Sequence, residues 1–235
     1  MEKILIGWQK QPNKLNIQGT IEKAIEEITG EQVELNASGR TDAGVHALAQ
    51  VANFKTNSKL PIEKIPLAIN SKLKKSIIIK EAEEVDERFH SRLTCKQKTY
   101  QYVINNTHNG TAIYRNLECH IPTKLDIDKM KQAVKYFIGE HDFKAFKASG
   151  TSSKSSVRTI YDAKVYNDND RIFIELTGNG FLYNMVRIIS GTLVDVGLGK
   201  IKPEEIENII NIGKRENAGK TLPAHGLYLV KVDYK

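Results

Sequence analysis

The spacing of apolar residues predicts amphipathic helices in both halves of the chain. Ile21, Ala24, Ile25 and Ile28 recur with the period of one helical face, and Gly30 can end that helix. A helix with such a stripe buries it against a sheet. Further helices are expected at 61–73, from an Asp126 cap to Gly139, at 181–193 and at 203–212.

Alternating and continuous apolar runs predict strands between these helices. Residues 99–104 alternate with period two, which places Tyr100 and Tyr102 on the same face of a strand. Extended segments are also expected at 33–36, 47–54, 76–79 as a buried strand, 160–166 and 171–176 as a hairpin, and 227–232.

Chain length allows one large domain or two smaller ones. The chain has 235 residues, of which 40% are hydrophobic, so it can bury a substantial core. The polar stretch 81–87 interrupts the alternation of helices and strands. We therefore expect two domains, 1–86 and 87–235.

Composition excludes several classes of protein. No apolar run approaches the roughly 18 residues of a membrane helix, and the apolar patch 4–8 is too short for a secretory signal. Cys95 and Cys119 lie far apart and outside any Cys/His cluster, so neither a zinc ribbon nor a disulfide scaffold is expected. These features favour a cytoplasmic protein without a metal and without a membrane.

The positive charge is concentrated in two segments. The chain has 35 basic and 28 acidic residues, a net charge of +7. Residues 88–117 and 143–161 carry nine basic residues and no Asp or Glu, and without them the balance is 26 against 28, or −2. A solvated face is one interpretation, but the interleaved aromatic residues favour RNA or DNA. The nine residues are Arg88, Arg92, Lys96, Lys98, Arg115, Lys144, Lys147, Lys154 and Arg158.

Asp42 is the first candidate for chemistry. It lies two residues after Arg40, and Gly39 and Gly44 stand on either side. A nearby positive charge keeps a carboxylate ionised, glycines let a ligand approach the backbone, and an ionised carboxylate can attack carbon. An Asx turn or a surface ion pair would also explain this aspartate.

Two further residues need an explanation. Arg187 is the one charge in the apolar run 181–193, so its guanidinium must reach solvent or a carboxylate, in a functional or a structural ion pair. Tyr100 follows two lysines on a predicted strand and suits stacking on a base or contact with a substrate. A core role is the alternative, and Tyr102 suits that role.

His46 has no second histidine at i+4, so we expect an ordinary hydrogen-bonded histidine and not a metal ligand.

Several blocks of sequence together resemble the tRNA pseudouridine synthase A family. Gly39-Arg40-Thr41-Asp42-Ala43-Gly44-Val45-His46-Ala47 resembles its catalytic signature. The other matching blocks, in the family's order, are Gly7-Trp8-Gln9, Phe89-His90 with Lys98-Thr99-Tyr100-Gln101-Tyr102, Phe181-Leu182-Tyr183-Asn184-Met185-Val186-Arg187, and Ala224-His225-Gly226-Leu227-Tyr228-Leu229.

The resemblance implies a reaction and roles for residues. The family isomerises uridine to pseudouridine at positions 38, 39 and 40 in the anticodon stem-loop of tRNAs, and no cofactor or metal is expected. Asp42 would be the nucleophile, Tyr100 would contact the uracil, and Arg187 would pair with the catalytic carboxylate. Arg40 would hold the RNA backbone. Lower-ranked RNA contacts are Lys98, Lys144, Lys147, Lys154 and Arg158.

The resemblance also implies an architecture. The fold class is α+β, with two related α/β domains forming a joined, mixed but mainly antiparallel sheet flanked by helices, and a basic RNA cleft. The N-terminal domain would carry the Asp42 loop and the C-terminal domain the Tyr100 and Arg187 motifs. A homodimer is expected, with one tRNA touching both subunits.

One departure and two alternatives stand beside this interpretation. Family members begin with a strand before the block that starts here at Gly7, so either the recorded start is late or this member lacks that strand. A non-catalytic RNA-binding protein on the same fold is the first alternative. A metal-dependent nuclease is the second, but it needs clustered carboxylates and Asp42 stands alone.

Overall fold

The computed structural model describes residues 6–11, 14–150 and 155–235. The apolar patch 4–8 and the Lys154 segment fall partly or wholly outside these residues. The chain forms two compact units, the first made of residues up to Gly44 together with 50–95, and the second of 45–49 together with 96–235. The domain boundary that we place between residues 86 and 87 stays a prediction.

The first unit is organised around helix α1 (Ile17–Thr29). Asn16 begins the helix by accepting a hydrogen bond from the Gly19 N–H at 2.8 Å, and Gly30 ends it with φ 75°. The helix therefore starts four residues before the predicted Ile21, because Asn16 is the better N-cap. The C-terminal glycine is confirmed.

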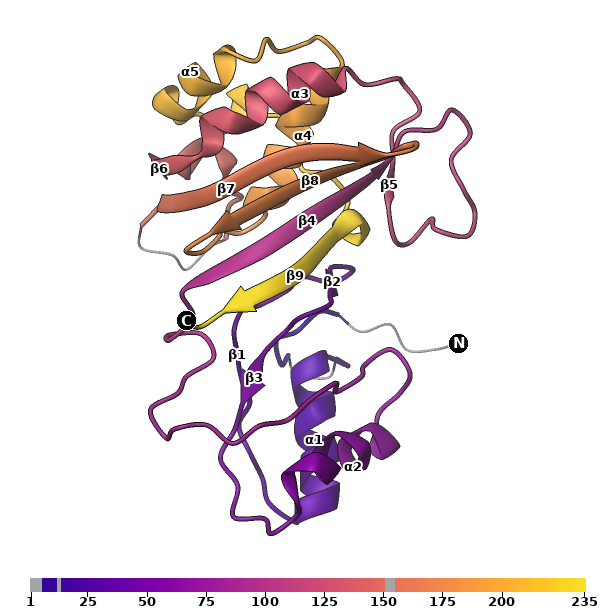
Figure 1. The fold of residues 1–235 in the computed structure, drawn as a ribbon, viewed down its shortest axis with the longest axis vertical. Helices are drawn as coiled ribbons and strands as arrows, with labels where there is room; N and C mark the ends of the chain where they lie inside the picture. The colour runs from indigo at the N-terminus through magenta and orange to yellow at the C-terminus, as the bar shows by residue number, and fades with distance from the viewer. Residues whose placement is uncertain (1–5, 12–13, 151–154) are drawn as a thin grey trace. The chain divides into compact units, whose positions relative to one another are not determined.

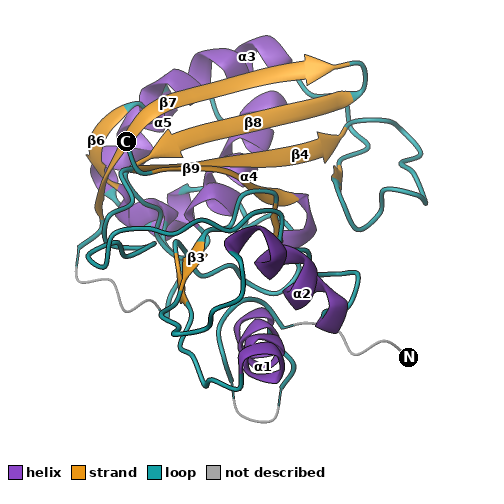
Figure 2. Cartoon of the chain, turned by 60° about the horizontal axis from the view of Figure 1, so that its bottom comes forward, coloured by secondary structure: helices purple, strands orange, loops and turns teal. Residues whose placement is uncertain are grey.

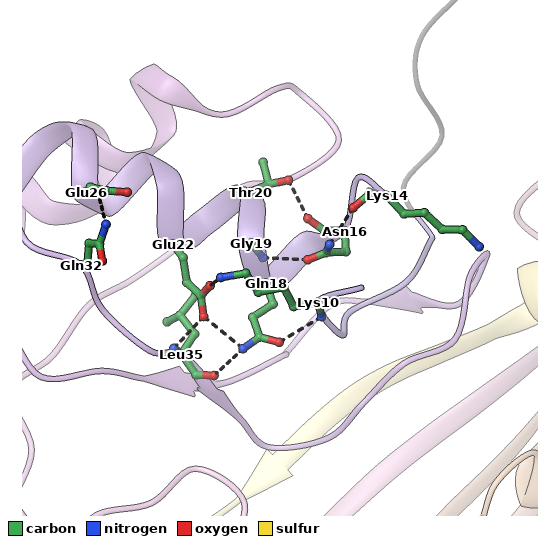
Figure 3. Close-up of polar contacts among 10 residues, drawn as sticks. All are labelled: Lys10, Lys14, Asn16, Gln18, Gly19, Thr20, Glu22, Glu26, Gln32 and Leu35. Atoms are coloured by element: carbon green, nitrogen blue, oxygen red, sulfur yellow. Dashed lines mark hydrogen bonds and ion pairs between the residues drawn. The ribbon is translucent and has the colours of Figure 1, made fainter. Parts of the chain in front are cut away.

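Side chains on α1 hold the segment that follows it. Figure 3 shows Gln18 and Glu22 reaching the main chain of Leu35. Glu22 accepts from the Leu35 N–H at 3.1 Å and Gln18 donates to its carbonyl oxygen at 3.2 Å. These bonds take the place of strand pairing, so the extended segment predicted at 33–36 yields only the short strand β1 (Asn36–Ala37).

The second helix of this unit is confirmed, and the strand predicted after it is wrong. A 3₁₀ turn η1 (Ile62–Lys64) leads into α2 (Ile65–Lys72). Residues 76–79 form no strand, because both main-chain polar groups of Ile79 bond the side chain of Asn70 at 2.8 Å and Ile78 is 68% exposed. The core of the unit consists of Trp8, Ile21, Ala24, Ile25, Leu35 and Ile69.

Short strands replace the single extended segment predicted at 47–54. Strand β2 (His46–Ala47) pairs in parallel with β9 (Leu227–Asp233) and belongs to the second unit. Strand β3 (Ala52–Asn53) pairs antiparallel with β1, as a two-stranded sheet within the first unit.

The second unit contains a seven-stranded sheet. Its order is β2-β9-β4-β8-β7-β6, with β5 pairing β4, and all pairs except β2-β9 and β4-β5 are antiparallel (Figure 1). The predicted α+β class with a mainly antiparallel sheet is confirmed, as are the hairpin β7-β8 and the last strand. The remaining strands are β4 (Gln97–Asn105), β5 (Cys119–His120), β6 (Gly139–Asp142), β7 (Val157–Asp168) and β8 (Arg171–Gly178).

Helices cover one face of this sheet and form a single large core with it (Figure 2). Asp126 caps the first of them as predicted, by accepting from the Lys129 N–H at 3.0 Å. The helix predicted at 181–193 begins four residues later and ends four residues later. The elements are α3 (Ile127–Ala133), η2 (Val134–Phe137), η3 (Phe143–Phe146), α4 (Met185–Gly197), α5 (Glu205–Ile212), η4 (Arg215–Asn217) and η5 (Ala224–Gly226).

The late start of α4 has a local cause. Asn184 adopts a left-handed conformation with φ 61°, which a continuous helix does not allow. The apolar spacing of residues 181–184 therefore belongs to a turn that packs on the core. Among the helices of the described chain, none is both long and apolar enough to span a membrane.

Candidate active site

The loop that carries Asp42 packs on the chain just before α1. The Trp8 N–H donates to the Thr41 carbonyl oxygen at 3.0 Å, and Thr41 is buried. Gly7 has φ 95°, and a Cβ at Gly7 would lie 2.7 Å from the same carbonyl oxygen. Only glycine suits so close an approach at a positive φ. The block at 7–9 therefore supports the loop, which gives a physical reason for the two motifs to occur together.

Side chains close the base of this loop. Ser38 Oγ donates to Gln50 Oε1 at 2.6 Å, and Gln50 Nε2 donates to the Gly39 carbonyl oxygen at 2.8 Å. Gly44 has φ 82° and makes a left-handed turn, whereas Gly39 does not adopt a positive φ. Hydrogen bonds thus fix the loop at Ser38, Gly39 and Thr41, just before Asp42.

Asp42 is half-buried in this loop, and Arg40 is exposed. A carboxylate that is neither fully buried nor fully solvated can reach a ligand and act as a nucleophile. The exposed guanidinium of Arg40 is free of the core and suits contact with phosphate. Both residues belong to the first unit, whereas Tyr100 and Arg187 belong to the second.

Tyr100 and Tyr102 share the buried face of β4, as predicted. Tyr102 is fully buried, and its hydroxyl donates to the Pro223 carbonyl oxygen at 2.7 Å. Burial raises the pKa of Tyr102 far above its usual value, so this hydroxyl stays protonated. Tyr100 is 9% exposed and meets the ring of Phe181 edge-on, with the centroids 5.1 Å apart. Tyr102 is the structural member of the pair.

Arg187 lies in the first turn of α4 and is half-buried. Its Nε donates to the Leu222 carbonyl oxygen at 2.7 Å, and its Nη1 donates to Asn184 Oδ1 at 2.7 Å. The Leu222 N–H returns a bond to the Arg187 carbonyl oxygen at 3.3 Å. The guanidinium is therefore held by acceptors of its own unit.

These contacts connect the second-unit residues to one another. Leu222 and Pro223 are consecutive, so Arg187 and Tyr102 bond adjacent carbonyl groups. Tyr100 contacts Phe181, which belongs to the same sequence block as Arg187. The structure thus brings together the two motifs that the sequence separates by more than eighty residues.

Two of the predicted RNA contacts lie near one end of the sheet. Lys98 stands opposite Gly178 in the pairing of β4 with β8. The Arg158 side chain lies beside Gly180, and its Nη1 donates to the Ser155 and Val157 carbonyl oxygens at 3.0 and 2.6 Å. Burial lowers the pKa of Arg158, which nonetheless keeps its charge.

The other predicted RNA contacts are placed differently. Lys147 is half-buried at the end of η3, and its neighbour Ala148 bonds the Tyr183 carbonyl oxygen at 3.1 Å. Lys144 is exposed, with its stem beside Gly213 at the end of α5. Lys154 lies outside the described residues. Only some of the predicted RNA contacts therefore lie near the sequence block from Phe181 to Arg187.

The sequence did not predict the supporting roles of Gly7 and Asn184. Gly7 acts by its lack of a side chain, and Asn184 by accepting a bond from Arg187. A glycine just before a tryptophan gives no sign of what packs on it. An asparagine before an apolar run does give a signal, since asparagine tolerates the left-handed conformation better than most residues.

No other described feature competes with these residues for chemistry. His46 Nε2 lies 2.9 Å from the Asn116 carbonyl oxygen and its ring stacks on Tyr228, which confirms a hydrogen-bonded strand histidine. No three His, Cys, Asp or Glu side chains among the described residues are grouped to hold a metal ion. A polar hollow of about 530 Å³ lies on the sheet of the second unit around Thr99, Lys164 and Glu175, and none of the predicted site residues lines it.

Comparison with known proteins defines the class. A family model described as tRNA pseudouridine synthase matches residues 6–93 and 133–235. These residues include the Asp42 loop and the Arg187 turn. The chain belongs to the tRNA pseudouridine synthase family, a family of isomerases, and the resemblance seen in its motifs is confirmed.

Individual relatives extend over nearly the whole chain. The tRNA pseudouridine synthase A of Caldicellulosiruptor bescii is 54% identical over 228 residues, which cover 97% of this chain and 93% of the relative. The protein of the same name from Caldicellulosiruptor saccharolyticus is 55% identical with the same coverage. A chain of a solved Cbf5-Nop10-Gar1 complex aligns with 97% of this chain and 48% of its own length at 12% identity, with a TM-score of 0.43, too low to support an argument.

Proposed function

We propose that this protein isomerises uridine to pseudouridine at positions 38–40 in the anticodon stem-loop of tRNAs, with Asp42 as the nucleophile. The observation that carries the proposal is a half-buried aspartate in a loop that Gly7, Trp8 and Gln50 fix, within a member of this family. Relatives named tRNA pseudouridine synthase A support the choice of tRNA as substrate.

The reaction requires the target nucleotide to leave the stem. Extrusion costs a few kcal/mol of stacking and pairing, which contacts from Lys and Arg to the RNA backbone offset. Asp42 then attacks at uracil C6 or at the sugar, and the C1′–N1 bond breaks. The uracil rotates, C1′ bonds to C5, the bond to Asp42 breaks, and the product forms as C5 loses a proton and N1 gains one. Atoms balance without a cofactor, because the C1′–N1 and C5–H bonds are exchanged for C1′–C5 and N1–H bonds and Asp42 is released as a carboxylate.

Arg187 and Tyr100 would act around this step. A guanidinium keeps its proton and matches a carboxylate with its fork, so Arg187 would keep Asp42 ionised and aimed. Tyr100 would contact the uracil from the β4 face, beside Phe181. Arg40 with Lys98, Lys144, Lys147, Lys154 and Arg158 would contact the RNA backbone in a basic cleft. We further propose a homodimer in the cytoplasm, with each tRNA touching both subunits.

The catalytic assignment is tested with tRNA tritiated at uracil C5. The wild type should release tritium, and Asp42→Asn should release none while still binding tRNA, because the amide cannot serve as the nucleophile. Asp128→Asn, on the exposed surface of α3, is the matched control and should keep the full rate. Undiminished release by Asp42→Asn would rule out the nucleophile, and product analysis distinguishes isomerised, unchanged and cleaved RNA.

The proposed RNA contacts are tested by reversing charge. Lys98→Glu with Lys147→Glu should weaken tRNA binding and reduce the slope of log K against log salt by about two. Each phosphate that loses its lysine keeps its counterions, so binding releases about one counterion fewer per lysine. Lys124→Glu with Lys135→Glu, both exposed, carries the same change in net charge and should leave the slope nearly unchanged. An equal effect of both pairs would indicate general charge and not local contact.

A further inference from the structure

The conformation of Asn184 is unusual for its position. Among the described residues, only Asn169 and Asn184 have a positive φ without being glycine, at 51° and 61°. Asn169 lies in the turn of the β7-β8 hairpin, where left-handed residues are common. Asn184 instead stands at the start of α4, where the capping residue ordinarily has extended backbone. The hairpin turn explains the left-handed conformation of Asn169, but it does not explain that of Asn184.

The Asn184 side chain also forgoes the bond that a capping residue makes. An N-cap asparagine ordinarily accepts from a main-chain N–H of the first helical turn. Asn184 makes no such bond, and its Oδ1 accepts from Arg187 Nη1 at 2.7 Å. The backbone conformation and the side chain therefore both serve the guanidinium at the expense of the helix end.

A second acceptor fixes the other side of the same guanidinium. Arg187 Nε donates to the Leu222 carbonyl oxygen at 2.7 Å, and the next carbonyl, that of Pro223, accepts from the buried Tyr102 hydroxyl at 2.7 Å. A Cβ at Gly226 would lie 2.7 Å from the Tyr102 ring, so the chain also packs tightly there. The segment that holds Arg187 is thus anchored on β4.

We propose that Asn184 is a positioning residue for the reaction, which together with the Leu222 carbonyl oxygen fixes the orientation of the Arg187 guanidinium. The inference rests on the proposed pairing of Arg187 with Asp42. A guanidinium has five N–H donors, so it can bond both acceptors and still donate to a carboxylate. Fixing it in advance removes the entropy loss of ordering a long side chain when substrate binds.

Two substitutions at this position separate the acceptor from the backbone conformation. Asn184→Gly deletes the amide but adopts φ 61° without strain, whereas Asn184→Ala deletes the amide and adds strain. A positioning role predicts that both lower kcat for tritium release about ten- to a hundredfold, with KM for tRNA within about twofold of wild type. Asn169→Gly makes the matched change in the hairpin and should keep the wild-type kcat.

The pH profile gives a readout that a merely structural role would not move. A loosened Arg187 stabilises ionised Asp42 less, so the acid limb of kcat/KM should shift to higher pH in Asn184→Gly. A wild-type rate and acid limb in Asn184→Gly, with loss only in Asn184→Ala, would overturn the inference and leave a conformational role.

Failure of the proposed function gives a different result. If wild-type protein releases no tritium from tRNA, or if Arg187→Lys keeps the full rate and pH profile, the proposed chemistry itself is wrong. If Arg187→Lys is impaired and Asn184→Gly is not, only the positioning inference fails.

Discussion

The loop around Asp42 and the turn before Arg187 each contain a left-handed residue, Gly44 with φ 82° and Asn184 with φ 61°, but they fix their functional side chains differently. The first is held by the main chain of Trp8 and the close approach of Gly7, with the Gln50 amide bonded to its base. The second depends on hydrogen bonds made by the Arg187 side chain itself.

The difference follows from the cores beneath the two regions. The first unit has short strands and a small core, so its loop is shaped by backbone packing where only glycine fits. The second unit has long strands and a large core, which provide a rigid base from which acceptors can be aimed. Steric changes should therefore damage the first region most, and loss of single polar atoms the second.

The largest effect is expected from Gly7→Ala. Positive φ costs alanine about 1–2 kcal/mol, and its Cβ must displace the Thr41 carbonyl oxygen, so we expect a total loss of about 3 kcal/mol of unfolding free energy. Movement of the loop should also lower the rate of tritium release about a hundredfold. Denaturant titration and the release assay measure the two.

Gly30→Ala is the control for that substitution. Gly30 has φ 75°, but nothing lies within 4 Å of a Cβ placed there. It should cost only about 1 kcal/mol and leave tritium release unchanged. If both glycine variants lost activity equally, backbone strain and not packing on the Asp42 loop would be the cause.

A smaller effect is expected in the second unit from Tyr102→Phe. The substitution leaves the Pro223 carbonyl oxygen without its donor, which should cost about 1–3 kcal/mol of unfolding free energy. Tyr166→Phe is the control, because its hydroxyl bonds Gln101 at an exposed position and should cost less than about 0.5 kcal/mol. Thermal unfolding should give a lower melting temperature for Tyr102→Phe than for Tyr166→Phe. Equal melting temperatures would contradict a stabilising hydrogen bond from Tyr102 to Pro223.

The smallest effect on the free energy of unfolding is expected from Asp233→Asn, and it depends on pH. Hydrogen bonding from Gln97 and then Lys231 lowers the pKa of Asp233 below its usual value. A lowered folded-state pKa stabilises the fold above the unfolded value of about 3.9 and is lost as the pH falls through the folded value. Asp233→Asn should therefore cost only a few tenths of a kcal/mol at pH 6, given solvent screening, with the difference from wild type vanishing toward pH 2. A difference that grows on acidification would give the wrong sign.

Sequence predicted the regular elements well because their signals are local. The apolar stripe of α1, the Asp126 cap and the alternation at Tyr100 and Tyr102 each reflect the period of one element. The strand predicted at 76–79 failed because Asn70, a residue of the preceding helix, satisfies the main chain of Ile79. Apolar composition alone does not distinguish that arrangement from pairing with a strand.

The sequence predicted which residues form the candidate site but not which parts of the chain support them. The motifs named Asp42, Tyr100 and Arg187, but the supports of those residues come from distant parts of the chain. The carbonyl oxygens of Leu222 and Pro223 are present in every residue type, so no side-chain pattern marks them as acceptors. Close approach to Gly7 is equally invisible, since it depends on which loop the fold brings there.

The pairing of β2 with β9 determines how the protein can be divided. Residues 45–49 complete the sheet of the second unit, where the Leu48 N–H bonds the Leu229 carbonyl oxygen at 2.9 Å. A fragment cut at a single point before Lys96 would lose this strand and expose the edge of β9. Unpaired edges recruit strands from other molecules, so such a fragment should aggregate. Separate expression of a soluble second unit would need residues 45–49 supplied as a peptide or joined by permutation.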